Sequence, residues 1–149
     1  MKKVFFILLF ALILITIIVT YTVYQYRKNE IEKQKINNEY SVYLNKTIPG
    51  TELMSLINKT LDINVKNGIQ RKEKNYFDIN NEELIQIYIE FIYKDETRTL
   101  QIEDIEKGGT EAFIKNYNSA HFKCTSINYY KTTNKVKSLT FSEISEINN

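Results

Sequence analysis

The stretch from Val4 to Tyr26 contains no charged side chain, and this limits what the chain can fold into more than any other feature. Fourteen of the sixteen residues from Val4 to Val19 are Val, Ile, Leu or Phe. As a helix, the uncharged stretch extends about 35 Å, whereas the hydrocarbon core of a bilayer is about 30 Å thick. Transfer of its apolar residues into lipid is favourable by about 4 to 8 kcal/mol. Because a helix that is apolar on every side has no solvent face, we predict a transmembrane helix over residues 4–26.

The flanks of this stretch favour a signal-anchor that stays attached over a cleaved signal peptide. The apolar run is longer than the core of a signal peptide, and no A-x-A-like cleavage site follows it. It also lacks the cysteine that a lipoprotein would need. Lys2, Lys3 and the α-amino group slightly outweigh Arg27 and Lys28. The positive-inside rule then predicts a short cytoplasmic segment over 1–3 and a C-terminal domain outside the cell membrane.

The residues that follow the apolar stretch have the composition of one ordinary soluble domain. The chain has 20 Lys plus Arg and 18 Asp plus Glu, and the two signs are interleaved. Since a nucleic-acid-binding protein would show a basic excess or stripe, we expect no nucleic-acid partner. Cys124 is the only cysteine, so no internal disulfide stabilises the domain.

Two segments are expected beyond the membrane. From Arg27 to Leu44 the chain has no Gly or Pro and few apolar positions, which predicts a solvated helical stalk over 27–47. Pro49-Gly50 then ends this helix. Residues 48–149 are expected to form an extracytoplasmic α+β domain.

Helices and hairpins alternate in the predicted domain. Thr51 to Asn67 has a helical pattern, with Thr51 as the N-cap and the apolar face Leu53, Leu56, Ile57 and Leu61. Leu84 to Tyr93 alternates as a strand does and forms a hairpin with Arg98 to Ile105. A helix with Thr110 as its N-cap precedes a second hairpin over 121–130 and 135–144. The fold class is therefore α+β, with a mostly antiparallel sheet.

Other features of the domain leave alternatives open. Residues 69–81 receive no assignment, with Tyr76, Phe77 and Ile79 as candidate strand or loop anchors. The two Gly-Thr-Glu openings, at Gly50 and Gly109, allow an internal duplication, but three matched residues are weak evidence for one.

The chemistry-bearing side chains form no recognisable catalytic or metal constellation. His121 and Cys124 are three residues apart, so on a strand they face opposite sides and cannot chelate one ion. Cys124 shares its side with Phe122 and is expected in the core. We interpret three acidic residues as lying on a solvated edge and not as calcium ligands: Glu103, Asp104 and Glu106. No oxygen-rich calcium-binding loop accompanies them. We therefore expect no catalytic, cofactor-binding or metal-binding residues and no cofactor.

Three stretches resemble uncharacterised membrane-anchored small-domain proteins of AT-rich Gram-positive bacteria: YLNKTIPGTELMSLINKTLDIN, FKCTSINYY and LTFSEI. This resemblance implies location and layout but no chemistry. The layout also resembles that of pilin subunits, in which an apolar helix extends into a stalk with a small sheet. The chain differs from pilins in having no Gly just before the apolar run and no Glu among its first residues.

Three functional hypotheses follow. The first is a single-pass, non-catalytic protein-interaction or assembly module at the cell envelope, with the lipid bilayer and an envelope protein as partners. A pilin-like filament subunit is the alternative. An enzyme with a concealed site comes third, and a pocket converging on Glu90, Glu103 or Glu143 would support it.

Overall fold

A computed structural model describes residues 2–72, 75–93 and 96–144 of the chain. The chain divides into two compact units between Ile36 and Asn37. The first unit is helical. The second contains a sheet and three further helices, so the molecule is α+β as the sequence predicts.

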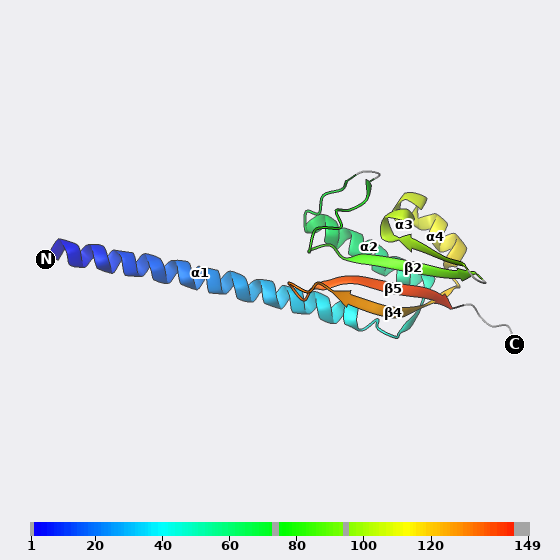
Figure 1. The fold of residues 1–149 in the computed structure, drawn as a ribbon, viewed down its shortest axis with the longest axis horizontal. Helices are drawn as coiled ribbons and strands as arrows, with labels where there is room; N and C mark the ends of the chain where they lie inside the picture. Colours follow the sequence, from blue (N-terminus) through cyan, green and yellow to red (C-terminus); the bar gives the residue numbers. More distant parts are fainter. Residues whose placement is uncertain (1, 73–74, 94–95, 145–149) are drawn as a thin grey trace. The chain divides into compact units, whose positions relative to one another are not determined.

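The first unit is the part of helix α1 (Lys2–Ser41) that precedes Asn37; the helix runs from blue to cyan in Figure 1. The large apolar side chains between Val4 and Tyr26 are each 43% to 67% exposed. The hydroxyls of Thr16, Thr20 and Thr22 donate to carbonyls one turn earlier, at 2.7 to 2.8 Å, so these polar groups are satisfied within the helix. By length and composition, α1 is compatible with a membrane anchor.

The second unit is built on a five-stranded sheet with the order β1-β4-β5-β2-β3. Its strands are β1 (Thr47–Pro49), β2 (Gln86–Tyr93), β3 (Glu96–Gln101), β4 (His121–Tyr129) and β5 (Val136–Ile144). The pairs β2–β3 and β4–β5 are antiparallel and confirm the two predicted hairpins. Strands β2 and β5 pair in parallel and so join the hairpins at the centre of the sheet.

Three helices lie on one side of this sheet: α2 (Gly50–Lys66), α3 (Ile102–Gly108) and α4 (Thr110–Tyr117) (Figure 1). Helix α4 packs against both α2 and α3. The predicted apolar face of α2 is confirmed, because all four of its residues are buried. Side chains with no exposed surface form the core between helices and sheet, among them Leu53, Ile57, Ile87, Ile89, Phe122 and Leu139.

The predicted N-caps of α2 and α4 are wrong. Helix α2 begins at Gly50 after Pro49, and no side chain caps it. A Cβ atom at Gly50 would lie 1.9 Å from the carbonyl oxygen of Tyr117, and the Gly50 amide donates to the Ala120 carbonyl at 2.9 Å. This close packing sets the start of α2 in place of a Thr51 cap. Helix α4 likewise begins at Thr110 itself, after Gly109.

The predicted strand from Arg98 to Ile105 is also wrong in its second half. Strand β3 ends at Gln101 and α3 begins at the next residue. The Gln101 and Asp104 side chains form a capping box. In it, the backbone N–H of Gln101 donates to Asp104 Oδ2 at 3.0 Å. Ile102 and Ile105 are both buried. Their three-residue spacing matches one face of a helix, so the helix buries both where a strand would not.

The last turn of α1 belongs to the second unit, whereas the sequence predicts a solvated stalk there. Tyr40 has no exposed surface. Thr60 Oγ1 donates to the Leu56 carbonyl at 2.8 Å, so the Tyr40 hydroxyl is the donor in its 2.8 Å bond to Thr60 Oγ1. Asn37 accepts from the Val136 amide at 2.9 Å and donates to the Asn134 carbonyl at 2.8 Å. The second unit thus begins before residue 48.

Within residues 69–81, the described parts 69–72 and 75–81 are anchored to the rest of the second unit. Arg71 and Phe77 make an isolated antiparallel bridge. Of the three candidate anchors, Phe77 is buried, Tyr76 is half-buried and Ile79 is 71% exposed.

Candidate functional site

The two residues considered first for nucleophilic or metal chemistry point to different sides of β4. His121 is exposed, whereas Cys124 has no exposed surface, which confirms its predicted core position. Burial raises the pKa of the Cys124 thiol to about 11, so the thiol is protonated near neutral pH. Since the thiolate is the reactive form, Cys124 has the properties of a small core residue.

Glu103 is not on a solvated edge as expected. It is only 1% exposed, because the first turn of α3 directs it inward. Its two carboxylate oxygens accept from Gln86 Nε2 at 3.1 and 3.0 Å, and Oε1 also accepts from the Phe77 amide at 3.3 Å. The positive end of a helix also favours a carboxylate in this turn. Glu103 therefore connects β2, α3 and the segment before β2.

The other two acidic residues of α3, Asp104 and Glu106, bind side chains of the segment before β2. Glu106 makes a bidentate ion pair with Arg71: the two terminal guanidinium nitrogens of Arg71 donate to the two carboxylate oxygens of Glu106, at 2.8 and 3.0 Å. Asp104 accepts a hydrogen bond from the Tyr76 hydroxyl, and this bond raises the pKa of Tyr76. The three acids of α3 thus act together as structural links to Arg71, Tyr76 and Phe77.

The three carboxylates considered for a concealed enzyme site are not brought together. Glu90 accepts from the Ser142 hydroxyl at 2.9 Å, and the two residues are register partners in β2 and β5. Glu143 follows Ser142 in the same strand and so faces the opposite side of the sheet. Glu103 is buried against Gln86.

The sheet face that points away from the helices is mostly polar, with Ile92 as an exposed apolar side chain. The orientation of this face follows from β4, where Phe122 is buried and the next residue is exposed. One row of register partners crosses four strands of this face, namely Thr99, Glu90, Ser142 and Lys123. All four are exposed or half-exposed. The face offers hydroxyl and charged groups to a partner.

A cleft of about 300 Å³ lies between β3, α3 and α4. Arg98 and Leu100 line it from β3, Ile105 from α3, and Phe113 and Tyr117 from α4. The register of β3 explains the orientation of its two residues, because their partners in β2 are Phe91 and Ile89, both buried on the helix side.

Aromatic rings form a cluster next to the cleft. The Tyr117 ring lies 4.9 Å from the Phe91 ring and 5.0 Å from the Phe113 ring, measured between centroids. Phe122 contacts the same three rings at 6.1 to 6.3 Å. Rings at these separations pack favourably, so the apolar part of the cleft lining belongs to a well-packed aromatic cluster.

Arg98 supplies an available positive charge at this cleft. It is exposed and forms no ion pair within the described part of the chain. The lining residue Asp104, by contrast, already accepts from Tyr76 and from the Gln101 amide. The sequence did not predict this cleft, because its walls depend on where β3 ends and α3 begins.

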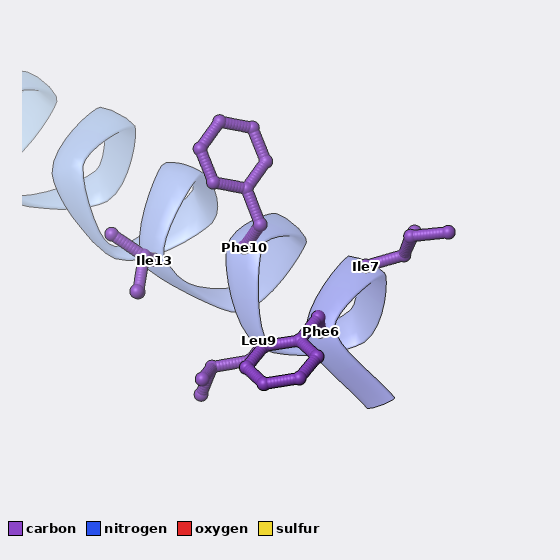
Figure 2. A pocket seen from close by; sticks show the side chains of 5 residues that line it. All are labelled: Phe6, Ile7, Leu9, Phe10 and Ile13. Carbon is purple, nitrogen blue, oxygen red and sulfur yellow. The ribbon is translucent and has the colours of Figure 1, made fainter. Parts of the chain in front are cut away.

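The surface of α1 contains a shallow depression of a different kind. Figure 2 shows its lining residues, Phe6, Ile7, Leu9, Phe10 and Ile13, and their side chains project outward from the helix. They do not converge on an enclosed space. Such a surface fits the flexible acyl chains of lipids better than a ligand of defined shape.

Comparison with known proteins adds no family to these observations: no protein-family model, curated protein or solved structure matches the chain.

Proposed function

We propose that this chain is a single-pass membrane protein that presents its second unit outside the cell as a non-catalytic protein-interaction module of an envelope assembly. The observation that supports this most is the exposure of α1, whose large apolar side chains are 43% to 67% exposed from Val4 to Tyr26. Each Å² of apolar surface in water costs about 25 cal/mol, and a bilayer removes that cost.

Charge supports the proposed orientation, and aromatic residues indicate where the span ends. Lys3 lies before the apolar stretch, while Tyr21, Tyr24 and Tyr26 lie at its other end and are exposed. Tyrosines are enriched where a helix leaves the hydrocarbon core. The positive-inside rule favours a cytoplasmic N-terminus by a small margin, because Lys2, Lys3 and the α-amino group slightly outweigh Arg27 and Lys28.

An interaction role is supported by the surface of the second unit. Its polar sheet face and the cleft with Arg98 are open to a partner. The acids of α3, which a metal or catalytic site would use, are instead engaged with residues 69–81 and Gln86.

A pilin-like filament subunit is the second candidate. The observation that favours it is α1 itself, which continues from Lys2 to Ser41 and ends with Tyr40 buried in the second unit. Recovery from membranes of a full-length chain with an unprocessed Met1 or Lys2 start would contradict this candidate.

Labelling of engineered cysteines in intact cells tests the orientation. Lys131 lies in the exposed turn between β4 and β5, so Lys131→Cys should react with a membrane-impermeant maleimide without cell disruption. The matched control is a cysteine inserted between Met1 and Lys2, which keeps both lysines and should react only after disruption. Cys124 is buried and should contribute no background. The reverse pattern would refute the outside location of the second unit.

Photocrosslinking in native membranes tests the interaction role. A photoreactive amino acid replaces one exposed residue at a time, at Asn116 beside the cleft and at Lys123 and Asn128 on β4. We expect at least one position to give an adduct of defined mass with an envelope protein. If all three positions give none, the interaction proposal is wrong.

A further inference from the structure

We propose that the free edge of β3 pairs with the same edge of a second copy of the chain, as an antiparallel β3–β3 contact centred on Thr97. This inference rests on the proposed function and names one partner of the interaction module, the chain itself.

The backbone of β3 is unpaired along one side within the described residues, because β3 pairs there only with β2. Its first four residues are exposed. Unpaired N–H and C=O groups along an edge are a template for another strand.

The other edge of the sheet is a much poorer template. Strand β1 has only three residues, and one of them is Pro49, which has no amide hydrogen to donate. Strand β3 has six residues without Pro or Lys, and its register with β2 is unbroken. Natural sheets usually protect their edges with charged side chains, Pro or a bulge; β3 has no Pro, Lys or bulge, and its two charged residues, Glu96 and Arg98, are opposite in sign, so they can pair across a contact between two copies.

The charges on β3 select both the partner and the register. Glu96 and Arg98 are both exposed, and neither forms an ion pair in the described part of the chain. They are two residues apart, so both side chains lie on the same face of the strand. Antiparallel pairing about Thr97 joins residues 96–98 of the two copies and places Glu96 of each copy opposite Arg98 of the other.

A shift of this register removes the complementarity. Pairing about Arg98 would place the two guanidinium groups opposite each other, which is unfavourable. Pairing about Thr99 would place Arg98 opposite Leu100 and leave both charges without partners. The register about Thr97 forms two ion pairs, and it brings the partner's carboxylate to the side of Arg98 that lines the cleft.

Membrane anchoring strengthens such a contact. A short edge-to-edge pairing with two exposed ion pairs is weak between freely diffusing molecules, since each exposed pair contributes little. Two chains confined to the same bilayer have a high effective concentration. The contact therefore suits a protein held by α1.

Disulfide crosslinking of the full chain in its native membrane tests the pairing. Residues opposite each other in an antiparallel pair have Cα atoms about 4.5 to 5.5 Å apart, within the range of a disulfide. Thr97→Cys should therefore crosslink two copies under mild oxidation. In the proposed register the two copies of Thr99 lie about 13 Å apart along the strands, so the matched control Thr99→Cys should not crosslink.

Charge exchange makes the test specific. In the Thr97→Cys background, Arg98→Glu or Glu96→Arg alone should reduce crosslinking about tenfold, because two attractive pairs become repulsive. The double exchange, Glu96→Arg with Arg98→Glu, should restore it. Both residues are exposed, so the unit should keep its fold, which the thermal unfolding temperature of each variant checks.

Three outcomes would overturn the inference: no crosslinking of Thr97→Cys, crosslinking of Thr99→Cys as efficient as that of Thr97→Cys, or a loss that the double exchange fails to restore. The photocrosslinking from Asn116, Lys123 and Asn128 is a separate measurement. A chain that crosslinks to an envelope protein but never to itself would keep the proposed function and lose this inference.

Discussion

Helices α1 and α2 are both rich in apolar side chains, but α1 exposes them and α2 buries them. From Val4 to Tyr26 the large apolar side chains of α1 are 43% to 67% exposed, whereas Leu53 and Ile57 of α2 have no exposed surface. Apolar residues occur on every side of α1, so packing against one surface could not bury them all. In α2 they recur every three or four residues and face the sheet. The arrangement of apolar residues, more than their number, determines whether a helix needs lipid or protein.

The largest expected effect comes from charging α1. The double substitution Ile13→Arg and Ile17→Arg should abolish membrane retention, because each arginine near the centre of a span costs about 2.5 to 3.5 kcal/mol. Together these costs match the whole favourable transfer of the segment. Resistance to alkaline carbonate extraction measures retention. The control pair Ile13→Leu and Ile17→Leu should stay in the membrane, and retention of the arginine variant would argue against a span.

A cavity in α2 should give the next largest effect and sharpen the contrast with α1. Ile57→Ala should lower the free energy of unfolding of the second unit by about 2 to 5 kcal/mol, since a fully buried side chain leaves a cavity. The matched change Ile17→Ala in α1 should leave that free energy unchanged. Urea denaturation of the full chain in micelles, followed by near-ultraviolet circular dichroism, measures both. Equal effects would contradict the separation of the two units.

A methyl group at the start of α2 should have a smaller but clear cost. Gly50→Ala should destabilise the second unit by about 1 to 3 kcal/mol, because the new Cβ would lie 1.9 Å from the Tyr117 carbonyl oxygen. Gly108→Ala is the matched control, since nothing lies within 4 Å of a Cβ at that position. It should be neutral or slightly stabilising. The same denaturation experiment distinguishes them, and a neutral Gly50→Ala would show that the contact is loose.

The smallest expected effect concerns the last turn of α1. Tyr40→Phe should cost about 1 kcal/mol through loss of the hydrogen bond to Thr60. Burial raises the pKa of Tyr40 from 10.0 to about 12. The neutral phenol therefore stabilises the fold fully below pH 10, and this stabilisation is lost as the pH rises towards 12.

Urea midpoints measured from pH 8 to pH 11.5 check this prediction. The midpoint should fall less steeply with pH in Tyr40→Phe than in the wild-type chain. Cys124, whose pKa burial also raises, adds an alkaline loss that both proteins share. Parallel slopes would mean that Tyr40 is ionised as easily in the fold as outside it.

Much of the second unit was predictable because its signals are local. Alternation located the strands of both hairpins, and helical spacing located the buried face of α2. The burial of Cys124 followed from its parity with Phe122. Each of these predictions uses residues a few positions apart, which the period of a helix or strand brings to one side.

The errors concern residues whose partners lie far away in the sequence. Glu103 was expected in solvent, yet it is buried because Gln86 and the Phe77 amide satisfy its carboxylate. Thr51 has the composition of an N-cap, but the packing of Gly50 against Tyr117 decides where α2 starts. The cleft beside Arg98 was missed for the same reason, since three separate elements form it.

The sequence by itself determined the apolar character of α1 on every side and the strand and helix periods of the second unit, because these depend on the order of neighbouring residues. Only the tertiary structure decided that β2 and β5 pair in parallel, that β3 lies at an edge with Arg98 beside a cleft, and that Tyr40 and Glu103 are buried. These features arise from contacts between residues far apart in the chain. Such contacts leave no periodic pattern in a single sequence.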